Sequence, residues 1–418
     1  MNDFMDRRGF ERRLETGLLE EADRFEELGG RELHLDEVLG RAGGLRRRRR
    51  TVTGLVAAAA VVALIAPAGV ILADRDSASG PAPLAHPTGH ASTVPTANAD
   101  TGRQPAPGVL DVSDLPTGEA ARVDYLQQGT LHLADGGTAA VQTRHTPQEF
   151  VELKDGARVW QTVDHGTSYV EVQEPDGTFR DPVRSHFGLS SNPAHTIASW
   201  ILPSGQVMVW QGGTSAPQPL GDPVPGSDLR IGPVTGADCS LACTVDVNVL
   251  DRDLQPWEVT DSGTHPLRDG SYLTVADVSE AGLSVGLTKI SDFSTCSTLL
   301  GEGEFAGFST CRNQLTSFSP DGRLILALPS YYDGLGPGAI AMYDLHGKRL
   351  FERSSTEQAQ SWFTDAVWED DSHLLVPVFQ DGTWSLVRIG TDGHLEYAAP
   401  QVTPKGPDAT RSPFLLPR

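Results

Sequence analysis

After residue 115, polar turns alternate with short hydrophobic runs along the chain. In the stretch FSPDGRLILAL, residues 318–328, a Pro-Asp-Gly turn ends at Gly322 and an apolar run follows. Turn residues between apolar runs are the strongest short-range signal for a β-hairpin. The same arrangement occurs seven times, marked by Gly129, Gly166, Gly205, Cys243, Gly282, Gly322 and Ser372.

The spacing of these markers is nearly regular, with intervals of 37, 39, 38, 39, 40 and 50 residues. A period of ~40 residues with several short strands per repeat is typical of β-propeller blades. We therefore predict an all-β chain with a β-propeller over residues 116–405. Seven markers favour seven blades. Six or eight stay open, because the marker at Cys243 is not glycine and the last interval is long.

Two stretches resemble the repeats of WD40 and TolB-like β-propellers. They are Ser319-Pro320-Asp321-Gly322 and the later AMYDLHGKRL, and the resemblance extends over roughly 115–405. It implies a closed ring of small sheets whose loops and central funnel hold a partner or ligand. No Trp-Asp dipeptide closes each blade, so the resemblance is to the architecture and not to a functional subfamily.

A different pattern precedes the repeats. Residues 51–73 carry no charge and are rich in Ala, Val, Leu and Ile, and their number is about the ~20 that a membrane-spanning helix needs. Acidic residues follow the segment, and five arginines precede it: Arg46, Arg47, Arg48, Arg49 and Arg50. The positive-inside rule then predicts a single-pass protein of a bacterial cell membrane, with a cytoplasmic N-terminus and an extracytoplasmic C-terminal domain. A cleaved signal peptide is the alternative.

Three further segments complete the predicted organisation. Residues 1–50 form a partly helical cytoplasmic arm with balanced charge, which either lies near the membrane or docks a cytosolic partner. With its arginine block, the arm resembles the short inner arms of sigma-factor-associated membrane proteins. Residues 74–115 are rich in Pro, Ala, Ser and Thr, which predicts a disordered linker. Residues 406–418 are predicted to be a C-terminal tail.

Charge and cysteine content narrow the function classes. The net charge of −22 lies entirely after residue 50, which argues against nucleic-acid binding by the propeller. All four cysteines follow the membrane segment, as in an oxidising compartment. Of the three possible connectivities we predict the two local ones, Cys239 with Cys243 and Cys296 with Cys311. The first would staple a hairpin turn, and the second would close an insertion between two blades. A metal site is a weaker alternative, because the spacing is not CxxC.

The sequence presents one catalytic motif. Residues Gly282 to Gly286 match G-x-S-x-G, but no helical period follows, so a nucleophile elbow is not expected. The acidic runs at 251–253 and 369–371 are expected to be solvated turns, and the tryptophans are expected to pack between blades. We expect no cofactor and no catalytic residue.

These features predict a membrane-anchored extracytoplasmic propeller that binds a partner protein or a cell-envelope ligand. One alternative is a transmembrane sensor that signals through the cytoplasmic arm. The other is an extracytoplasmic propeller enzyme of the lactonase or glycan-active type, with acidic groups or a metal in its channel.

Overall fold

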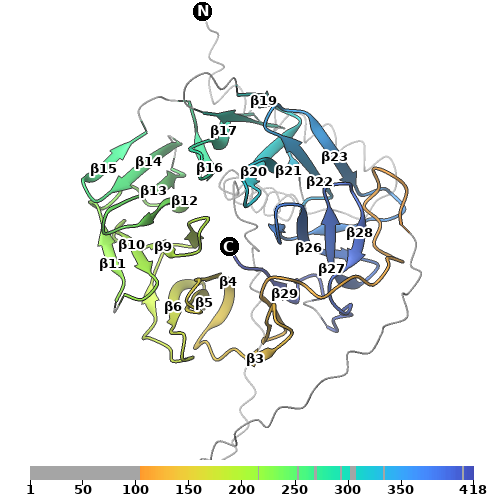
Figure 1. Cartoon of the computed structure of the whole chain (residues 1–418), viewed down its shortest axis with the longest axis horizontal. Helices are drawn as coiled ribbons and strands as arrows, with labels where there is room; N and C mark the ends of the chain where they lie inside the picture. Colours follow the sequence, from red (N-terminus) through yellow and green to blue (C-terminus); the bar gives the residue numbers. More distant parts are fainter. Residues whose placement is uncertain are drawn as a thin grey trace, which may run out of the picture. The chain divides into compact units, whose positions relative to one another are not determined.

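A computed structural model describes residues 104–418, apart from 215, 252–253, 268–270, 292–293, 302–306, 333–334 and 407–408. These residues form an all-β fold without any α-helix, and seven small sheets stand around a common axis (Figure 1). The prediction of a seven-bladed β-propeller is confirmed. The predicted arm, membrane helix and first part of the linker lie outside the described residues. Within the described part, no helix has the length and apolarity needed to cross a membrane.

Each blade is an antiparallel sheet, and its strands are named below from the one nearest the axis outwards (Figure 1). Blade 1 contains β29 (Phe414–Leu415), β1 (Tyr125–Gln127), β2 (Thr130–His132) and β3 (Thr138–Ala140). Blade 2 contains β4 (Thr146–Glu152), β5 (Arg158–Asp164), β6 (Thr167–Gln173) and β7 (Val183–Arg184). Blade 3 contains β8 (Ser190–Ser191), β9 (Ile197–Ile201), β10 (Val207–Gln211) and β11 (Gln218–Leu220).

The other four blades follow the same plan. Blade 4 contains β12 (Leu229–Asp238), β13 (Ala242–Val249), β14 (Gln255–Thr260) and β15 (Gly263–Pro266). Blade 5 contains β16 (Thr274–Val278), β17 (Ser284–Ile290), β18 (Thr295–Leu300) and β19 (Ser309–Thr310). Blade 6 contains β20 (Asn313–Phe318), β21 (Leu324–Pro329), β22 (Ala339–Asp344) and β23 (Arg349–Ser354). Blade 7 contains β24 (Trp362–Phe363), β25 (Val367–Trp368), β26 (His373–Gln380), β27 (Thr383–Gly390) and β28 (Leu395–Tyr397).

The ring closes in blade 1, where a strand from the end of the chain pairs with β1. β29 pairs antiparallel with β1, in the register Leu126↔Leu415 and Gln127↔Phe414. The segment 406–418 was predicted to be a tail outside the propeller. It instead supplies the innermost strand of blade 1, and this corrects the predicted boundary at residue 405.

The segment before blade 1 is also part of the ring. Leu110, Val112 and Leu115 are at most 3% exposed and lie in one apolar cluster with strands of blades 6 and 7. Isolated bridges join Val109 to Ser354 of β23 and Thr117 to Tyr397 of β28. Residues 104–115, predicted to be disordered linker, are therefore ordered, because apolar side chains within this segment are buried against the outer strands.

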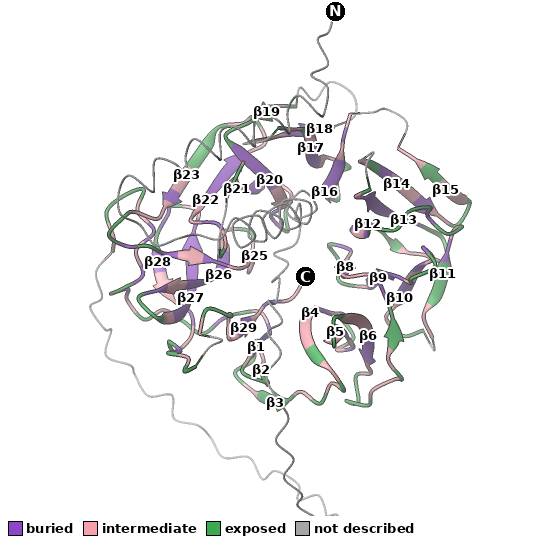
Figure 2. Cartoon of the chain, turned by 180° about the vertical axis from the view of Figure 1, so that it is seen from behind, coloured by how far each residue is buried: buried purple, intermediate pink, exposed green. Residues whose placement is uncertain are grey.

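Apolar side chains fill the junctions between neighbouring blades. Six buried clusters each join two consecutive blades around the ring. Trp160, Trp200, Trp210 and Trp384 are 0–2% exposed and lie within these clusters, which confirms that they pack between blades. Exposed residues gather on outer strands such as β3 and β7 (Figure 2). Stacking therefore buries the face that a single blade could not bury alone.

Each blade holds one of the seven turn markers, although not at an equivalent position. Gly129, Gly166 and Gly205 lie in the turn between the second and third strands, whereas the other four markers lie at the turn between the first and second. The five glycine markers have φ between 69° and 86°. This left-handed conformation favours glycine at either turn. The pattern therefore predicted the number of blades but not the phase of each repeat.

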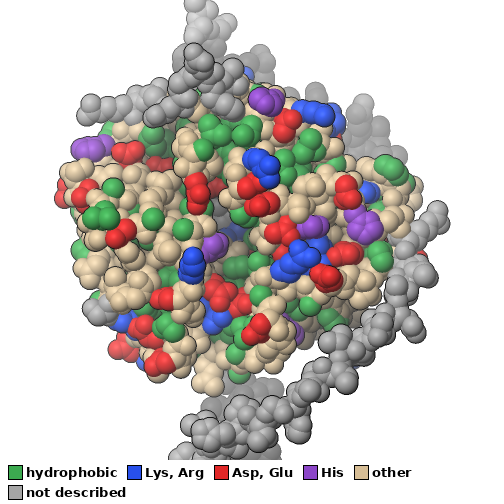
Figure 3. All heavy atoms as spheres, in the orientation of Figure 1, with side chains coloured by type: hydrophobic (Ala, Val, Ile, Leu, Met, Phe, Trp, Pro, Cys, Tyr) green, Lys and Arg blue, Asp and Glu red, His purple; other side chains and the backbone are tan. Residues whose placement is uncertain are grey.

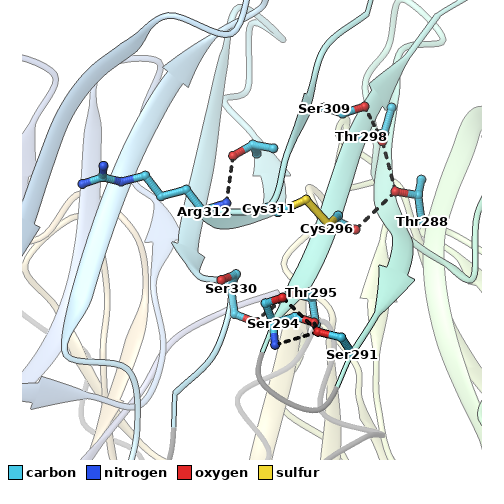
Figure 4. The surroundings of a disulfide bond; sticks show 11 residues. Thr288, Ser291, Ser294, Thr295, Cys296, Thr298, Ser309, Cys311, Arg312 and Ser330 are labelled. Atoms are coloured by element: carbon cyan, nitrogen blue, oxygen red, sulfur yellow. Dashed lines mark hydrogen bonds between the residues drawn. A yellow bond between two sulfur atoms is a disulfide. The ribbon is translucent and has the colours of Figure 1, made fainter.

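Both predicted disulfides form. Cys239–Cys243 links the turn between β12 and β13. Cys296–Cys311 links β18 to the residue after β19, beside the hydroxyl groups of Thr288, Thr298 and Ser309 (Figure 4). The second bridge was expected to close an insertion between blades, but it closes the outer hairpin of blade 5.

Removing the two disulfides is expected to have unequal effects. Cross-linking stabilises a fold by lowering the entropy of the unfolded chain, and the gain increases with the length of the closed loop. The sequence separations are 15 for Cys296–Cys311 and 4 for Cys239–Cys243. We expect the paired Cys→Ser replacements to lower the free energy of unfolding by about 3 and about 2 kcal/mol respectively. Urea unfolding of the two variants measures the difference, and an equal loss would contradict this account.

Candidate functional site

Backbone irregularities mark the innermost strands. The pairing register shifts between Pro147 and Glu149 in β4, and between Val275 and Asp277 in β16. In blade 7 the innermost strand is interrupted between β24 and β25, where Asp365 lies. A bulge redirects a side chain that would otherwise alternate between the faces of the sheet. Such irregularities accompany the carboxylates of Glu149 and Asp365, which reach a common cation.

That cation is Arg418, just after β29, where the chain runs to the centre of the ring (Figure 1). Its Nη2 lies 3.3 Å from Glu149 Oε1, and its Nη1 lies 3.0 Å from Asp365 Oδ1. The Ser191 hydroxyl donates to the Arg418 carbonyl at 2.9 Å, and the Leu189 N–H donates to Glu149 Oε2 at 3.2 Å. Groups from blades 1, 2, 3 and 7 thus meet here, and we call Glu149, Asp365 and Arg418 the axial cluster.

Burial dominates the electrostatics of the axial cluster. Burial raises the pKa of Glu149. The positive charge of Arg418 opposes this increase, and the negative charge of Asp365 adds to it. Arg230, further away, also lowers the pKa of Glu149. Because the three charged groups form ion pairs with one another, they are better suited to joining blades than to transferring a proton. We therefore assign the axial cluster a structural role.

A second group of residues lies beside the axial cluster, and we call His186, Phe187 and Arg230 the channel mouth. Arg230 lies near the start of β12, with its guanidinium carbon 5.2 Å from the centroid of the Phe187 ring. Its Nη1 donates to the Phe187 carbonyl at 3.4 Å. All three side chains are half-buried. Acidic, basic and histidine side chains border the centre of the face shown in Figure 3.

The channel mouth carries unused hydrogen-bonding capacity. Among the described residues, no carboxylate lies within ion-pair distance of Arg230, and the buried Nε2 of His186 has no hydrogen-bond partner. Burial lowers the pKa of His186; Asp228 opposes this shift and Arg230 adds to it. A guanidinium near an aromatic ring still presents a planar set of donors that matches a carboxylate. The channel mouth is therefore a candidate site for an acidic group.

The structure also places the motifs considered for catalysis. The G-x-S-x-G match spans the turn between β16 and β17 and the start of β17, so it lies within a β-hairpin of blade 5. The Oγ of Ser284 lies 3.0 Å from the Tyr272 hydroxyl. Asp251 accepts from Ser227 at 2.8 Å. The described residues contain no group of three His, Cys, Asp or Glu side chains that could hold a metal ion.

One expectation about the acidic runs is wrong. Glu369 was expected in a solvated turn, but its side chain is fully buried and pairs with Arg388, which is 3% exposed. Arg388 also binds Glu396 and donates to the carbonyls of Glu119 and Ala120. One member of this acidic run therefore neutralises a buried arginine. The neighbouring Asp370, at the surface, pairs with the exposed Arg122.

Comparisons with known proteins identify no family for this chain. No protein-family model matches the sequence, and no curated protein matches it. A solved structure of YCF48 bound to D1 peptide is similar at 14% identity and a TM-score of 0.44, covering 72% of this chain and 88% of that one. The β-propeller domain of the Trilobed protease from Pyrococcus furiosus is similar at 10% identity and a TM-score of 0.42, covering 61% and 85%. The Cps50 (Swd1) β-propeller of Myceliophteria thermophila is similar at 9% identity and a TM-score of 0.43, covering 64% and 89%.

Proposed function

We propose that this chain is a membrane-anchored, extracytoplasmic binding module whose channel mouth takes an acidic group of a partner protein or cell-envelope ligand. The observation that carries the proposal is the guanidinium of Arg230, which lies against Phe187 without a carboxylate partner among the described residues. A β-propeller suits a binding or scaffolding role, since its loops and funnel present a rigid surface.

Two further observations support the location. Both disulfides form, as expected for a domain in an oxidising compartment. The uncharged segment 51–73 follows the arginines 46–50, which is the sequence pattern of a helix that retains its N-terminus in the cytoplasm. Reporter fusions after residues 45 and 104 test this topology. An alkaline phosphatase active only in the second fusion is the expected result, and activity in the first would exclude it.

Replacing Arg230 by glutamine is expected to abolish selectivity for acidic ligands. The probes are fluorescein-labelled octapeptides in matched pairs that differ only by Glu or Gln at two positions. A charge-assisted hydrogen bond contributes about 1.5–3 kcal/mol, so wild-type protein should bind the Glu peptides at least about tenfold more tightly. Fluorescence anisotropy measures the dissociation constants. In Arg230→Gln, the Glu and Gln peptides of each pair should have the same dissociation constant.

The matched control is Arg323→Gln. Arg323 lies in the turn between β20 and β21, its side chain is 77% exposed, and it pairs with Asp321. This variant loses the same charge from the protein and should keep the preference for Glu peptides. Equal binding of Glu and Gln peptides by the wild-type protein would refute an acid-selective site. A preference that survives Arg230→Gln would place that site elsewhere.

A further inference from the structure

The junction between blades 4 and 5 differs from the other six. The buried apolar clusters join blades 1–2, 2–3, 3–4, 5–6, 6–7 and 7–1, and none joins blades 4 and 5 among the described residues. Apolar burial is the main favourable contribution to packing between blades. This junction, which we call the polar seam, is therefore held by other interactions.

Carboxylates line the blade 4 side of the polar seam. Asp246 of β13 lies directly opposite Glu258 of β14, and Glu258 lies opposite the exposed His265 of β15. Residues opposite one another in a sheet share a face. Asn248 is two positions from Asp246 on that same face, and its side chain bonds to Val275 of blade 5. The row of Asp246 and Glu258 therefore faces blade 5.

Hydroxyl groups line the blade 5 side. Val285 and Leu299 pack toward blade 6, so their neighbours Gly286 and Thr298 face blade 4. The Thr298 hydroxyl lies 3.2 Å from that of Thr288 and 2.8 Å from that of Ser309 (Figure 4). These hydroxyls hydrogen-bond one another and offer no positive charge to the carboxylates opposite.

Asp246 is the least satisfied group of the seam. It is 8% exposed, and among the described residues its carboxylate has no hydrogen bond or ion pair. The charged groups on the packed strands do not compensate it: Glu258 repels it, Arg230 lies opposite Asn248, and Asp277 turns toward blade 6 to accept the Phe318 N–H. Burial, with a contribution from Glu258, raises the pKa of Asp246 to about 7.

The inner edge of the polar seam is fastened more firmly than its outer part. Asn248 accepts from the Val275 N–H at 2.8 Å and donates to the Val275 carbonyl at 2.9 Å, next to the axis. The ring of Tyr272 covers Gly286, and its hydroxyl donates to the Ser284 carbonyl at 2.8 Å. The outer strands have no apolar contact comparable with those of the other junctions. We therefore expect β13 and β14 to separate from β17 and β18 at a lower free-energy cost than blades joined by an apolar cluster.

We propose that the propeller opens at the junction between blades 4 and 5, and that ionisation of Asp246 promotes this opening. In the closed ring the carboxyl group of Asp246 is buried, which stabilises its protonated form. In the open ring water solvates the ionised carboxylate. The closed form is thus fully stabilised at a pH below the ordinary value for Asp, about 4, and loses this stabilisation as the pH rises toward 7. Acidification closes the seam and neutral pH loosens it.

Hydrogen exchange of the full chain tests the proposal at each junction separately. Exchange rates are divided by the intrinsic base-catalysed rate at each pH between 5.0 and 8.0. We expect amides of β13, β14, β17 and β18 to exchange through an opening whose equilibrium constant rises about tenfold per pH unit below pH 7. Amides of β9 and β10, next to the apolar junctions of blade 3, should show no such rise. Uniform protection in all blades would overturn the proposal.

Two aspartate variants identify the group responsible. Asp246→Asn should remove the pH response of the polar seam, with Asp246→Ser as a second variant if the amide impairs folding. Asp277→Asn is the matched control. Asp277 is also buried with a pKa raised to about 7, but it accepts the N–H groups of Val278 and Phe318 beside the apolar cluster of blades 5 and 6. A pH response that survives Asp246→Asn, or disappears in Asp277→Asn, would contradict the assignment.

Discussion

Deletion of residues 412–418 is expected to prevent the propeller from closing. The segment contains β29, and Phe414 and Leu416 are 4% and 1% exposed in the cluster that joins blades 7 and 1. Burying two such side chains contributes about 1.5–3 kcal/mol each, which is a large part of a typical stability of about 5–15 kcal/mol. The deletion also exposes the unpaired edge of β1, which favours association between chains.

Chemical unfolding and size-exclusion chromatography measure this effect. The deleted chain should lose its cooperative unfolding transition and elute as aggregates. A milder variant, Leu416→Ala, should lower the free energy of unfolding by about 2–5 kcal/mol. Leu350→Ala removes the same atoms from a side chain that is 39% exposed on β23, and should cost less than about 1 kcal/mol. If the two leucine variants were equally stable, closure by β29 would not limit stability.

Replacement of Arg388 by leucine is expected to destabilise the propeller strongly. It leaves the fully buried carboxylate of Glu369 without its cation, and it leaves the carbonyls of Glu119 and Ala120 without their donor. Breaking a buried ion pair costs about 3–5 kcal/mol, because the remaining charge stays buried. Urea unfolding followed by tryptophan fluorescence measures the loss.

Arg122 provides the matched control within the same network. Its side chain is 51% exposed and pairs with Glu119 and Asp370 at the surface, so Arg122→Leu should cost at most about 1 kcal/mol. The double variant Glu369→Gln with Arg388→Leu should recover part of the stability lost in Arg388→Leu alone, since the fully buried carboxylate of Glu369 is then replaced by a neutral amide. A double variant less stable than Arg388→Leu would show that the ion pair is not the cause.

Local sequence features predicted the architecture. A turn that requires a positive φ favours glycine, as at Gly282 and Gly322. Five such glycines, together with the turns at Cys243 and Ser372, predicted seven blades. The two disulfides were predictable because each closes a short loop. The phase of the repeat was not predictable, since Gly166 occupies the same conformation in a different turn of its blade.

Features that depend on ring closure could not be predicted from local sequence patterns. β29 is two residues long, too short to show the alternation of apolar and polar residues that predicts a strand. It is a strand only because it pairs with β1. The axial cluster joins Glu149 to Arg418 across 269 positions of sequence. Arg230 and Phe187 are separated by 43 positions and meet at the channel mouth because blades 2, 3 and 4 curve around the axis. The polar seam likewise becomes evident only when the blades are known to be neighbours.

The composition of blade 1 constrains the order of assembly. Its three outer strands are the first strands of the described chain, and its inner strand β29 is the last. During translation β29, which pairs with β1, is therefore synthesised only after the other six blades. Until then β1 has an open edge, and the nascent protein is a curved, unfinished arc. The time needed to translate this domain therefore sets a minimum on how long that edge requires protection, whether by a chaperone or by transient contacts within the arc.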